Sequence, residues 1–225
     1  MRIWRLEYTP IVWEHWVKIL CRGYTMEKVV LYIHGKDGSH LEAERYKKNC
    51  LGFDLIGVEY DDYLPWIVQK KFKSVYETVF ERYDCVYLIA NSIGAYLAMY
   101  ALQDFDIAKA LFISPVLDME RLILDMMSWA NVSEGDLCEK GEIPTEFGET
   151  LSWKYLCFAR ENHITWNVYT EILYAENDNL VSRQTINQFI GAHNANLTVM
   201  ENGEHWFHTD EQLAFLDSWM EKAIR

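Results

Sequence analysis

A formal net charge of −13 on a chain of 225 residues limits what this protein can bind. The excess of acidic over basic side chains, 34 against 21, repels nucleic acid phosphates and anionic membrane surfaces, so neither is an expected partner. Because 50% of the residues are hydrophobic and 24% are charged, the chain has enough apolar surface for a core, and one globular domain over residues 1–225 is expected.

The N-terminal segment and the cysteines indicate the compartment. Charged residues interrupt the apolar residues of MRIWRLEYTPIVWEHW, unlike in a signal peptide, and no other run is long and apolar enough to span a bilayer. The cysteines are odd in number and form no CxxC pair, which argues against a disulfide framework and a zinc site: Cys21, Cys50, Cys85, Cys138 and Cys157. The sequence therefore predicts a cytoplasmic protein with free thiols.

Short runs of β-branched and aromatic residues alternate with amphipathic helical patterns along most of the chain. The apolar runs predict strands over residues 28–34, 53–60, 84–91, 108–114, 171–175 and 196–200. Apolar residues at helical spacing predict helices over 68–83, after residue 92, over about 182–191 and around 213–223. Because parallel strands need crossover connections, this α/β alternation predicts a mostly parallel central sheet flanked by helices.

The alternation stops over residues 116–167, where helical pieces are broken by Gly135, Gly141, Pro144 and Gly148, so we expect a helical cap insertion there. Its large apolar side chains suit an apolar acyl or alkyl group of a substrate, or else pack the cap against the sheet: Met126, Met127, Trp129, Trp153, Tyr155, Phe158 and Trp166. Its acidic side chains make a poor entrance for a polyanionic thioester such as acyl-CoA: Glu134, Asp136, Glu139, Glu142, Glu146 and Glu149.

The residues that follow the predicted strand 84–91 are the first candidates for chemistry, because ligands collect at the carboxyl ends of parallel strands. Ser92 lies there, directly before a helix, in the strand–turn–helix layout of a nucleophile elbow. Such a turn needs small residues two positions before and after the serine, and here they are Ala90 and Gly94. The alternative is that Ser92 only caps the helix that follows.

A serine nucleophile needs a base within hydrogen-bond reach, and the base needs an orienting acid. Asp178 follows the predicted strand 171–175, and His205 follows the predicted strand 196–200. Alone, Asp178 reads as a turn residue and His205 as a half-buried histidine. Three suitable residues in the order Ser, Asp, His, each after its own strand, favour a catalytic triad.

Through the segments IHGKDG, ANSIGA, YAENDNLVS and NGEHWF, the chain resembles the α/β-hydrolase superfamily over nearly its whole length, most of all small bacterial serine hydrolases with a helical cap. The resemblance implies the α/β-hydrolase fold and an oxyanion hole. In that hole, His34 and Gly35 form a turn that presents the backbone N–H of Lys36, and the backbone N–H of Ile93 is the second donor. His34 itself is expected to anchor its own loop.

The predicted activity is that of a carboxylesterase acting on a small neutral ester through an acyl-enzyme on Ser92, with no metal or organic cofactor. Amidase, aminopeptidase or thioesterase activity on the same triad is the alternative, and His208 and Asp118 compete for the roles of base and acid. A non-catalytic ligand-binding protein of the same fold is the rival from another class. A phosphate-binding protein with HGKDGS as its anion loop is a weaker reading, because the sequence lacks GxGxxG and GxxxxGK[ST].

Overall fold

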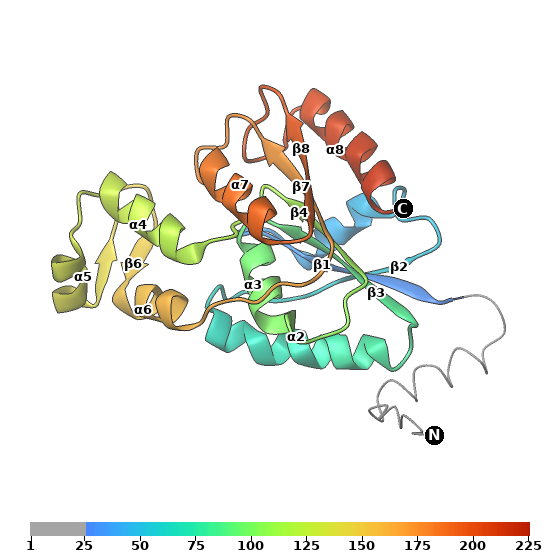
Figure 1. Ribbon diagram of the computed structural model, residues 1–225, viewed down its shortest axis with the longest axis horizontal. Helices are drawn as coiled ribbons and strands as arrows, with labels where there is room; N and C mark the ends of the chain where they lie inside the picture. Colours follow the sequence, from blue (N-terminus) through green and yellow to red (C-terminus); the bar gives the residue numbers. More distant parts are fainter. Residues whose placement is uncertain (1–25) are drawn as a thin grey trace, which may run out of the picture.

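Six strands form one sheet in the order β2-β1-β3-β4-β7-β8, and every pairing in it is parallel (Figure 1). The structure is a computed structural model that describes residues 26–225, so Cys21 and the N-terminal segment read for an export signal lie outside the described residues. The strands are β1 (Lys28–Ile33), β2 (Asp54–Gly57), β3 (Cys85–Asn91), β4 (Lys109–Ile113), β7 (Thr170–Ala175) and β8 (Ala195–Met200). The predicted parallel sheet is confirmed.

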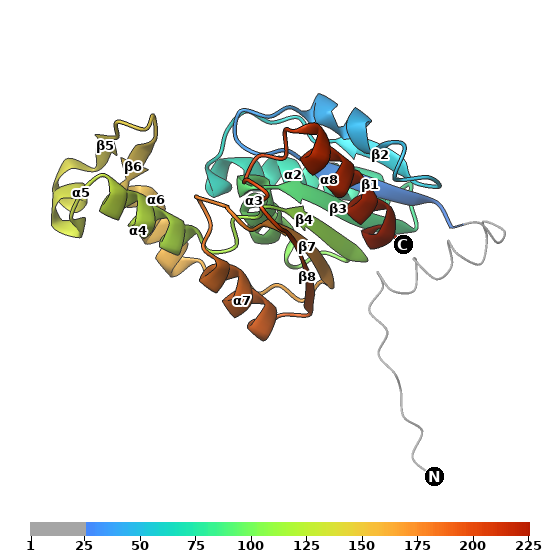
Figure 2. The same ribbon diagram turned by 90° about the horizontal axis from the view of Figure 1, so that it is seen from above.

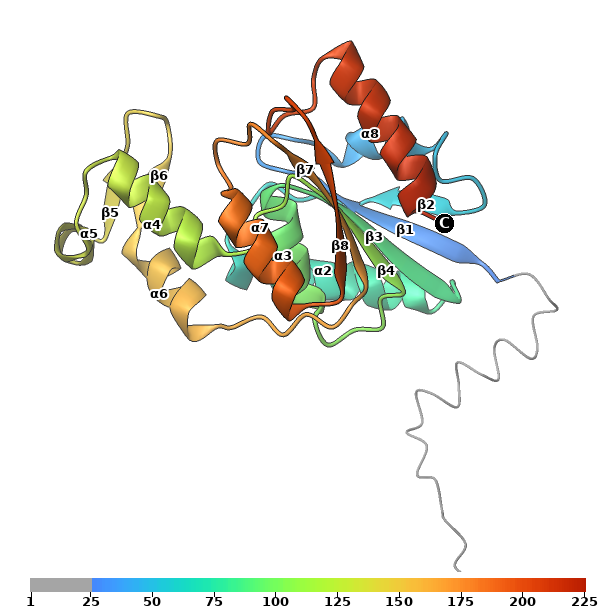
Figure 3. The same ribbon diagram turned by 45° about the horizontal axis from the view of Figure 1, so that its top comes forward.

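Helices cover both faces of this sheet (Figures 1 and 3). One face packs against α2 (Pro65–Phe80), α3 (Ile93–Leu102) and α7 (Arg183–Ala192), and the other against the 3-10 helix η1 (His40–Tyr46) and α8 (Asp210–Ala223). Successive side chains of β1 point to opposite faces, so Leu31 joins the first core and Tyr32 the second. Burial on both faces explains why the strand sequences are almost continuously apolar.

Helix α2 begins three residues before the predicted start and also ends three residues before the predicted end at residue 83. Pro65 occupies its first position, where a missing N–H costs no hydrogen bond, so the helix extends beyond the apolar pattern. At the other end, the N–H groups of Arg82 and Tyr83 both donate to the Val79 carbonyl, which closes the last turn. Tyr83 is buried but not helical, which is why the apolar pattern continued too far.

The chain between β4 and β7 lies to one side of the sheet in all three views (Figures 1 to 3). It contains α4 (Met119–Trp129), α5 (Glu134–Lys140), β5 (Glu142–Pro144), β6 (Thr150–Ser152) and α6 (Trp153–Glu161). We call residues 116–167 the cap segment, and its status as an inserted unit stays a prediction.

The expectation of helical pieces alone in the cap segment was incomplete, because β5 and β6 form an antiparallel hairpin. Pro144 ends β5, and Gly148 lies in the turn at a φ of 87°, a conformation that glycine adopts without a steric penalty. Both residues therefore belong to a β-hairpin, Pro144 to its first strand and Gly148 to its turn, and not to a break between helices.

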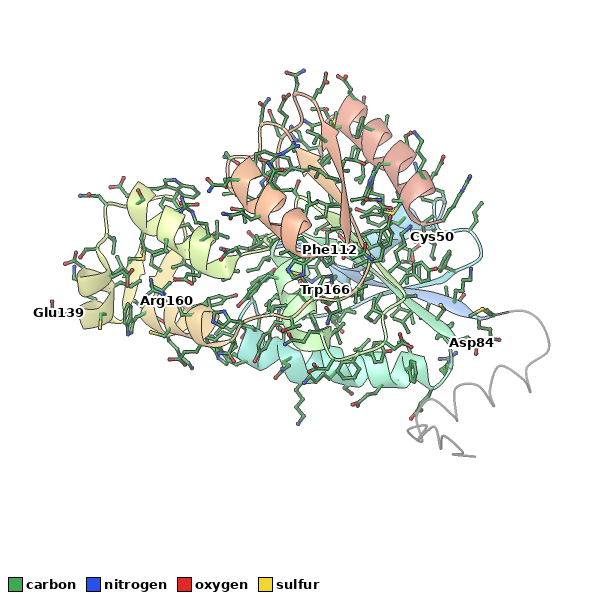
Figure 4. All side chains as sticks on the ribbon, in the orientation of Figure 1. Cys50, Asp84, Phe112, Glu139, Arg160 and Trp166 are labelled. Atoms are coloured by element: carbon green, nitrogen blue, oxygen red, sulfur yellow. The ribbon has the colours of Figure 1, made fainter. Side chains whose placement is uncertain are left out.

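Where the cap segment returns to the sheet, Trp166 is 1% exposed and its ring centroid lies 5.9 Å from that of Phe112 of β4 (Figure 4). The indole N–H of Trp166 donates to Oγ1 of Thr170 at 2.8 Å. Trp166 is thus a core residue that fixes the start of β7.

None of the helices within residues 26–225 combines the length and the hydrophobicity needed to cross a lipid bilayer. The four cysteines in the same range, Cys50, Cys85, Cys138 and Cys157, are free thiols. Burial raises the pKa of Cys50 to about 11, so this thiol stays protonated and unreactive at neutral pH.

Gly57, at the end of β2, should tolerate no side chain, because a Cβ there would lie 2.0 Å from the carbonyl oxygen of His40. We expect Gly57→Ala to lower the free energy of unfolding by about 2 kcal/mol or more in urea denaturation, since backbone has to shift. Gly191→Ala is the matched control, because Gly191 lies in α7 with nothing within 4 Å of the added Cβ. This substitution should raise the free energy of unfolding by up to about 1 kcal/mol. Equal effects at the two positions would contradict the tight contact between β2 and η1.

Candidate active site

Ser92 lies in the turn between β3 and α3 in a backbone conformation that is rare for any residue except glycine. Its φ is 48° and its ψ is −121°; it occupies the N-cap position of α3, but its side chain makes no capping hydrogen bond, so capping does not account for the hydroxyl. The Ser92 N–H donates to the carbonyl of Ile113 at 3.0 Å, and the Ser92 carbonyl accepts from Val116 N–H at 3.0 Å. These bonds hold a sharp strand-to-helix turn, which has the layout expected of a nucleophile elbow.

Two glycines let other parts of the backbone approach this turn closely. At Gly94 a Cβ would lie 2.4 Å from the carbonyl oxygen of His34, and at Gly35 it would lie 3.3 Å from Cβ of Ser92. The small residue predicted two positions after Ser92 is needed because the atoms nearest to the missing Cβ of Gly94 belong to the end of β1 and to His34, which follows it. The loop after β1 therefore lies directly against the serine.

Three side chains from separate loops meet at this turn. Nε2 of His205 lies 2.9 Å from Oγ of Ser92, and Nδ1 of His205 lies 2.7 Å from Oδ2 of Asp178. Because a carboxylate only accepts, Nδ1 carries the proton, and Nε2 is left to accept from the serine hydroxyl. The side chain of Asp178 is fully buried and that of His205 is 4% exposed, so these polar contacts lie in a region of low dielectric.

Backbone N–H groups fix the orientation of the Asp178 carboxylate. Its Oδ1 accepts from Leu180 N–H at 2.8 Å and from Val181 N–H at 2.9 Å, which leaves Oδ2 for His205. Three donors thus compensate a buried charge that would otherwise be costly to desolvate. The arrangement can draw a proton from a serine hydroxyl to an imidazole and hold the resulting imidazolium.

The competing candidates for base and acid lie elsewhere. The side chain of His208 is 60% exposed, and its Nδ1 bonds to the Trp206 carbonyl at 2.6 Å. Asp118 caps α4 by accepting from Arg121 N–H at 2.9 Å. Neither side chain contacts Ser92 within residues 26–225, so the geometry favours the first choices of the sequence analysis.

Two backbone donors lie on either side of Ser92. The N–H groups of Lys36 and Ile93 have no hydrogen-bond acceptor in the part of the chain that the structure describes. Lys36 follows Gly35, which lies against the serine, and Ile93 is the next residue in the chain. Free N–H groups at such positions are what an oxyanion hole requires.

His34 anchors the loop that carries Lys36, as expected. It is 2% exposed, with Nδ1 2.7 Å from the Gly35 carbonyl and Nε2 3.1 Å from the Tyr60 carbonyl. Its ring stacks on that of Tyr60 at a centroid distance of 4.1 Å. Contacts to neighbouring backbone on both ring nitrogens account for this histidine without a role in proton transfer.

The Lys36 side chain reaches the cap segment, which no sequence pattern indicated. Its Nζ lies 2.5 and 2.6 Å from the two carboxylate oxygens of Glu149, next to the hairpin turn, and the two side chains are 41% and 39% exposed. Nearby, Tyr155 of α6 donates to the Tyr63 carbonyl at 3.1 Å, and the Tyr63 hydroxyl accepts from Asp37 N–H at 2.9 Å. These contacts hold the cap segment beside the loop after β1.

The sequence analysis also missed a series of hydrogen bonds that begins at Asn91, the residue before Ser92. Nδ2 of Asn91 donates to the Tyr32 hydroxyl at 2.8 Å, Tyr32 donates to Glu42 at 2.5 Å, and Glu42 accepts from Ser39 N–H at 3.1 Å. Burial, above all, raises the pKa of Tyr32 far above its usual range, so its hydroxyl stays protonated and able to donate. The Ser-x-x-Glu capping box formed by Ser39 and Glu42 was the one readable signal.

The apolar side chains predicted to bind substrate differ in their surroundings. Met127 is buried in the main core, and Met126 and Trp153 pack partly against it. Phe158 packs its ring against aromatic rings of α2 and α3. Trp129 is 50% exposed at the end of α4. Packing accounts for four of the five, and a role of any of them in binding substrate stays a proposal.

The backbone conformation at Ser92 predicts which substitutions are best tolerated there. At this positive φ we expect Ser92→Gly to be more stable than Ser92→Ala by about 1 kcal/mol, because only glycine relieves the strain. At the exposed Ser74, inside α2, the order should be reversed, with glycine about 1 kcal/mol less stable than alanine. Urea denaturation of the four variants measures both differences, and the same order at both sites would contradict a strained turn.

Several solved structures are similar to this one. The α/β hydrolase domain-containing protein 10 from mouse has a TM-score of 0.71 at 15% identity, covering 87% of this chain and 89% of that chain. The peroxisomal α/β-hydrolase Lpx1 from Saccharomyces cerevisiae has a TM-score of 0.60 at 12% identity, covering 91% and 78%. The monoacylglycerol lipase from Paleococcus ferrophilus has a TM-score of 0.55 at 12% identity, covering 87% and 94%.

No protein-family model matches the sequence, and no curated protein is similar to it in sequence. The structural similarity extends over most of the chain in each of the three cases, and it agrees with the parallel sheet flanked by helices. The chain has the α/β-hydrolase fold.

Proposed function

We propose that this protein is a serine hydrolase that cleaves a small neutral carboxylic ester. The observation that carries the proposal is the hydrogen-bonded series of Ser92, His205 and Asp178, with distances of 2.9 and 2.7 Å between their side chains. A buried carboxylate, an imidazole in a fixed tautomer and a serine on a strained turn form a combination that suits nucleophilic catalysis better than packing.

In the proposed reaction, Oγ of Ser92 attacks the ester carbonyl carbon while Nε2 of His205 takes the hydroxyl proton. The tetrahedral intermediate then collapses, the bond to the alcohol oxygen breaks, and the imidazolium gives its proton to the leaving alkoxide. Water, deprotonated by the same nitrogen, attacks the acyl carbon of the acyl-enzyme. The bond between that carbon and Oγ of Ser92 then breaks, the imidazolium returns its proton to Oγ, and the carboxylic acid is released. Asp178 stabilises the imidazolium in both halves of the reaction and does not itself take up the proton.

The negative oxygen of each intermediate needs donors that are already in place. The N–H groups of Lys36 and Ile93 flank Ser92 without an acceptor of their own within residues 26–225, which supports them as the oxyanion hole. Loss of one such donor costs about 3–4 kcal/mol of transition-state stabilisation in enzymes of this kind. Because both donors belong to the main chain, the side chains at these positions are not part of the hole.

The charge of the cap segment supports a neutral substrate. Glu149 pairs with Lys36 and Glu134 with Arg160, but Glu139, Glu142 and Glu146 form no salt bridge among the described residues. Together with the net charge of −13, they repel polyanions. The Paleococcus ferrophilus neighbour is named as a monoacylglycerol lipase, which is in line with an ester.

Covalent labelling tests whether the protein is an enzyme of this class. A fluorophosphonate probe should modify the native protein at Ser92, because the base activates this hydroxyl, and should leave Ser92→Ala unmodified. Labelling is read by intact mass and by peptide mapping. Native protein that is labelled no more than Ser92→Ala would favour the rival, a non-catalytic protein that binds a small ligand.

Two histidine variants test the assignment of the base. His205→Ala should lower kcat/KM for p-nitrophenyl butyrate by about 10³-fold or more, because within residues 26–225 no other side chain is hydrogen-bonded to Oγ of Ser92. His208→Ala is the matched control, three residues further on with an exposed side chain, and should stay within about twofold of wild type. The opposite pattern would move the base to His208.

Rates on neutral esters of increasing acyl length, with matched amides and thioesters, identify the preferred substrate. Amides, peptide N-termini and thioesters are cleaved by the same three groups, so a faster rate on one of them would change the substrate and keep the mechanism. The cytoplasmic location stays a prediction.

A further inference from the structure

A cavity of about 280 Å³ lies where the cap segment joins the sheet, and neither Ser92 nor His205 lines it. Residues 117–120, where the chain enters the cap segment, and 162–164, where it returns, form two of its walls. Helix α7 forms another, and Tyr96, on the helix that begins after Ser92, also lines the cavity. A ligand held there would touch both ends of the cap segment at once.

The hydroxyl of Tyr96 is the first sign of a binding site. Tyr96 is 3% exposed, and its Oη is buried without a hydrogen-bond partner within residues 26–225. Burial, above all, raises the pKa of Tyr96, so the hydroxyl is neutral and keeps its capacity to accept and to donate. A buried hydroxyl without a partner is costly, and a ligand atom in the adjoining cavity would remove that cost.

The other polar groups in the cavity wall present acceptors. One oxygen of Asp118 caps α4, and the second has no partner in the described part of the chain. Asn162 uses its side-chain N–H on a carbonyl of its own helix, which leaves its Oδ1 open. Nδ1 of His193 faces the Trp166 carbonyl at 2.8 Å and so carries the proton of the neutral ring, which leaves Nε2 as an acceptor.

The charge of the residues that line the cavity favours a positively charged ligand. Among its lining residues the structure describes no lysine or arginine, while Asp118 and Glu120 are both acidic. The carboxylate of Glu120 forms a salt bridge with Arg160 at 2.7 Å (Figure 4). The carboxylate of Asp118 forms no salt bridge among the described residues. Phe189 adds an aromatic ring at the α7 wall, which favours a cation further.

We propose that this cavity binds a small organic cation that carries N–H donors, such as a primary ammonium or a guanidinium group. Its donors would meet the free oxygen of Asp118, Oδ1 of Asn162 and Oη of Tyr96. The described lining residues include no lysine or arginine that could pair with an anion. A metal ion is disfavoured, because residues 26–225 contain no group of three His, Cys, Asp or Glu side chains placed to hold one.

Titration of the full chain with n-butylammonium, followed by calorimetry or by NMR chemical shifts, tests the class of ligand. We expect saturable binding, with at least tenfold weaker binding of tetramethylammonium, which has the charge but no N–H, and of n-butanol, which has no charge. Absence of saturable binding, or equal affinity for n-butanol, would overturn the proposal.

Substitutions locate the site. Asp118→Asn keeps the helix cap, because asparagine caps as well as aspartate, but removes the charge, so binding should weaken at least tenfold. Asp125→Asn is the matched control, with the same change of charge on the same helix but outside the cavity, and should stay within twofold. Equal losses in the two variants would show that only the net charge matters and would reject the site.

Tyr96→Phe separates a binding role from a packing role. Because the hydroxyl has no partner in the described part of the protein, its removal should leave the urea unfolding midpoint unchanged or raised, while binding of n-butylammonium weakens about three- to tenfold. Unchanged affinity would remove Tyr96 from the site. Ser92→Ala should bind n-butylammonium as wild type does, so this test stays independent of the proposed hydrolysis.

Discussion

At Ser92 the main chain turns from β3 into α3 with a positive φ, and the surroundings hold it there. Such a conformation costs about 1–3 kcal/mol for a residue other than glycine. Backbone hydrogen bonds to Ile113 and Val116 offset that cost, and the missing side chain of Gly94 lets α3 begin against the end of β1. The hydroxyl is thereby lifted out of the sheet toward His205, and every other part of the candidate site is built around that position.

The parallel sheet supplies the partners of the serine from its carboxyl edge. β7 and β8 pair in register as far as Ala175 and Met200, so the loops that follow them start at the same level. Asn177 N–H donates to the Gly203 carbonyl at 2.9 Å, which ties the loop of Asp178 to the loop of His205. The relative placement of Asp178 and His205 therefore follows from strand register and a backbone hydrogen bond.

Much of this arrangement could be predicted from local sequence. Ser92, Asp178 and His205 were identified because each follows an apolar run, and strand ends in a parallel sheet converge on one edge. The β5–β6 hairpin was missed because Pro144 and Gly148 punctuate hairpins and helices alike. Contacts such as those of Asn91 with Tyr32 join residues far apart in the chain, and no local pattern records them.

The salt bridge between Lys36 and Glu149 could not be predicted from local sequence either, since only the folded cap segment brings the two residues together. With both side chains about 40% exposed, the pair is screened by solvent and contributes less than about 1 kcal/mol. The hairpin is therefore held beside the loop after β1 by a contact that is easy to break.

The separation of Ser92 from His205 has a consequence for folding. The two residues are 113 positions apart, and among residues 26–225 the strand β8, which precedes the histidine, pairs with β7 alone at the edge of the sheet. Pairing between distant strands is slow, because chain closure has to come before any gain from contacts. A chain that has been synthesised only as far as β7 carries Ser92 without His205, so the hydrogen bond between the two side chains forms only when the last strand has docked.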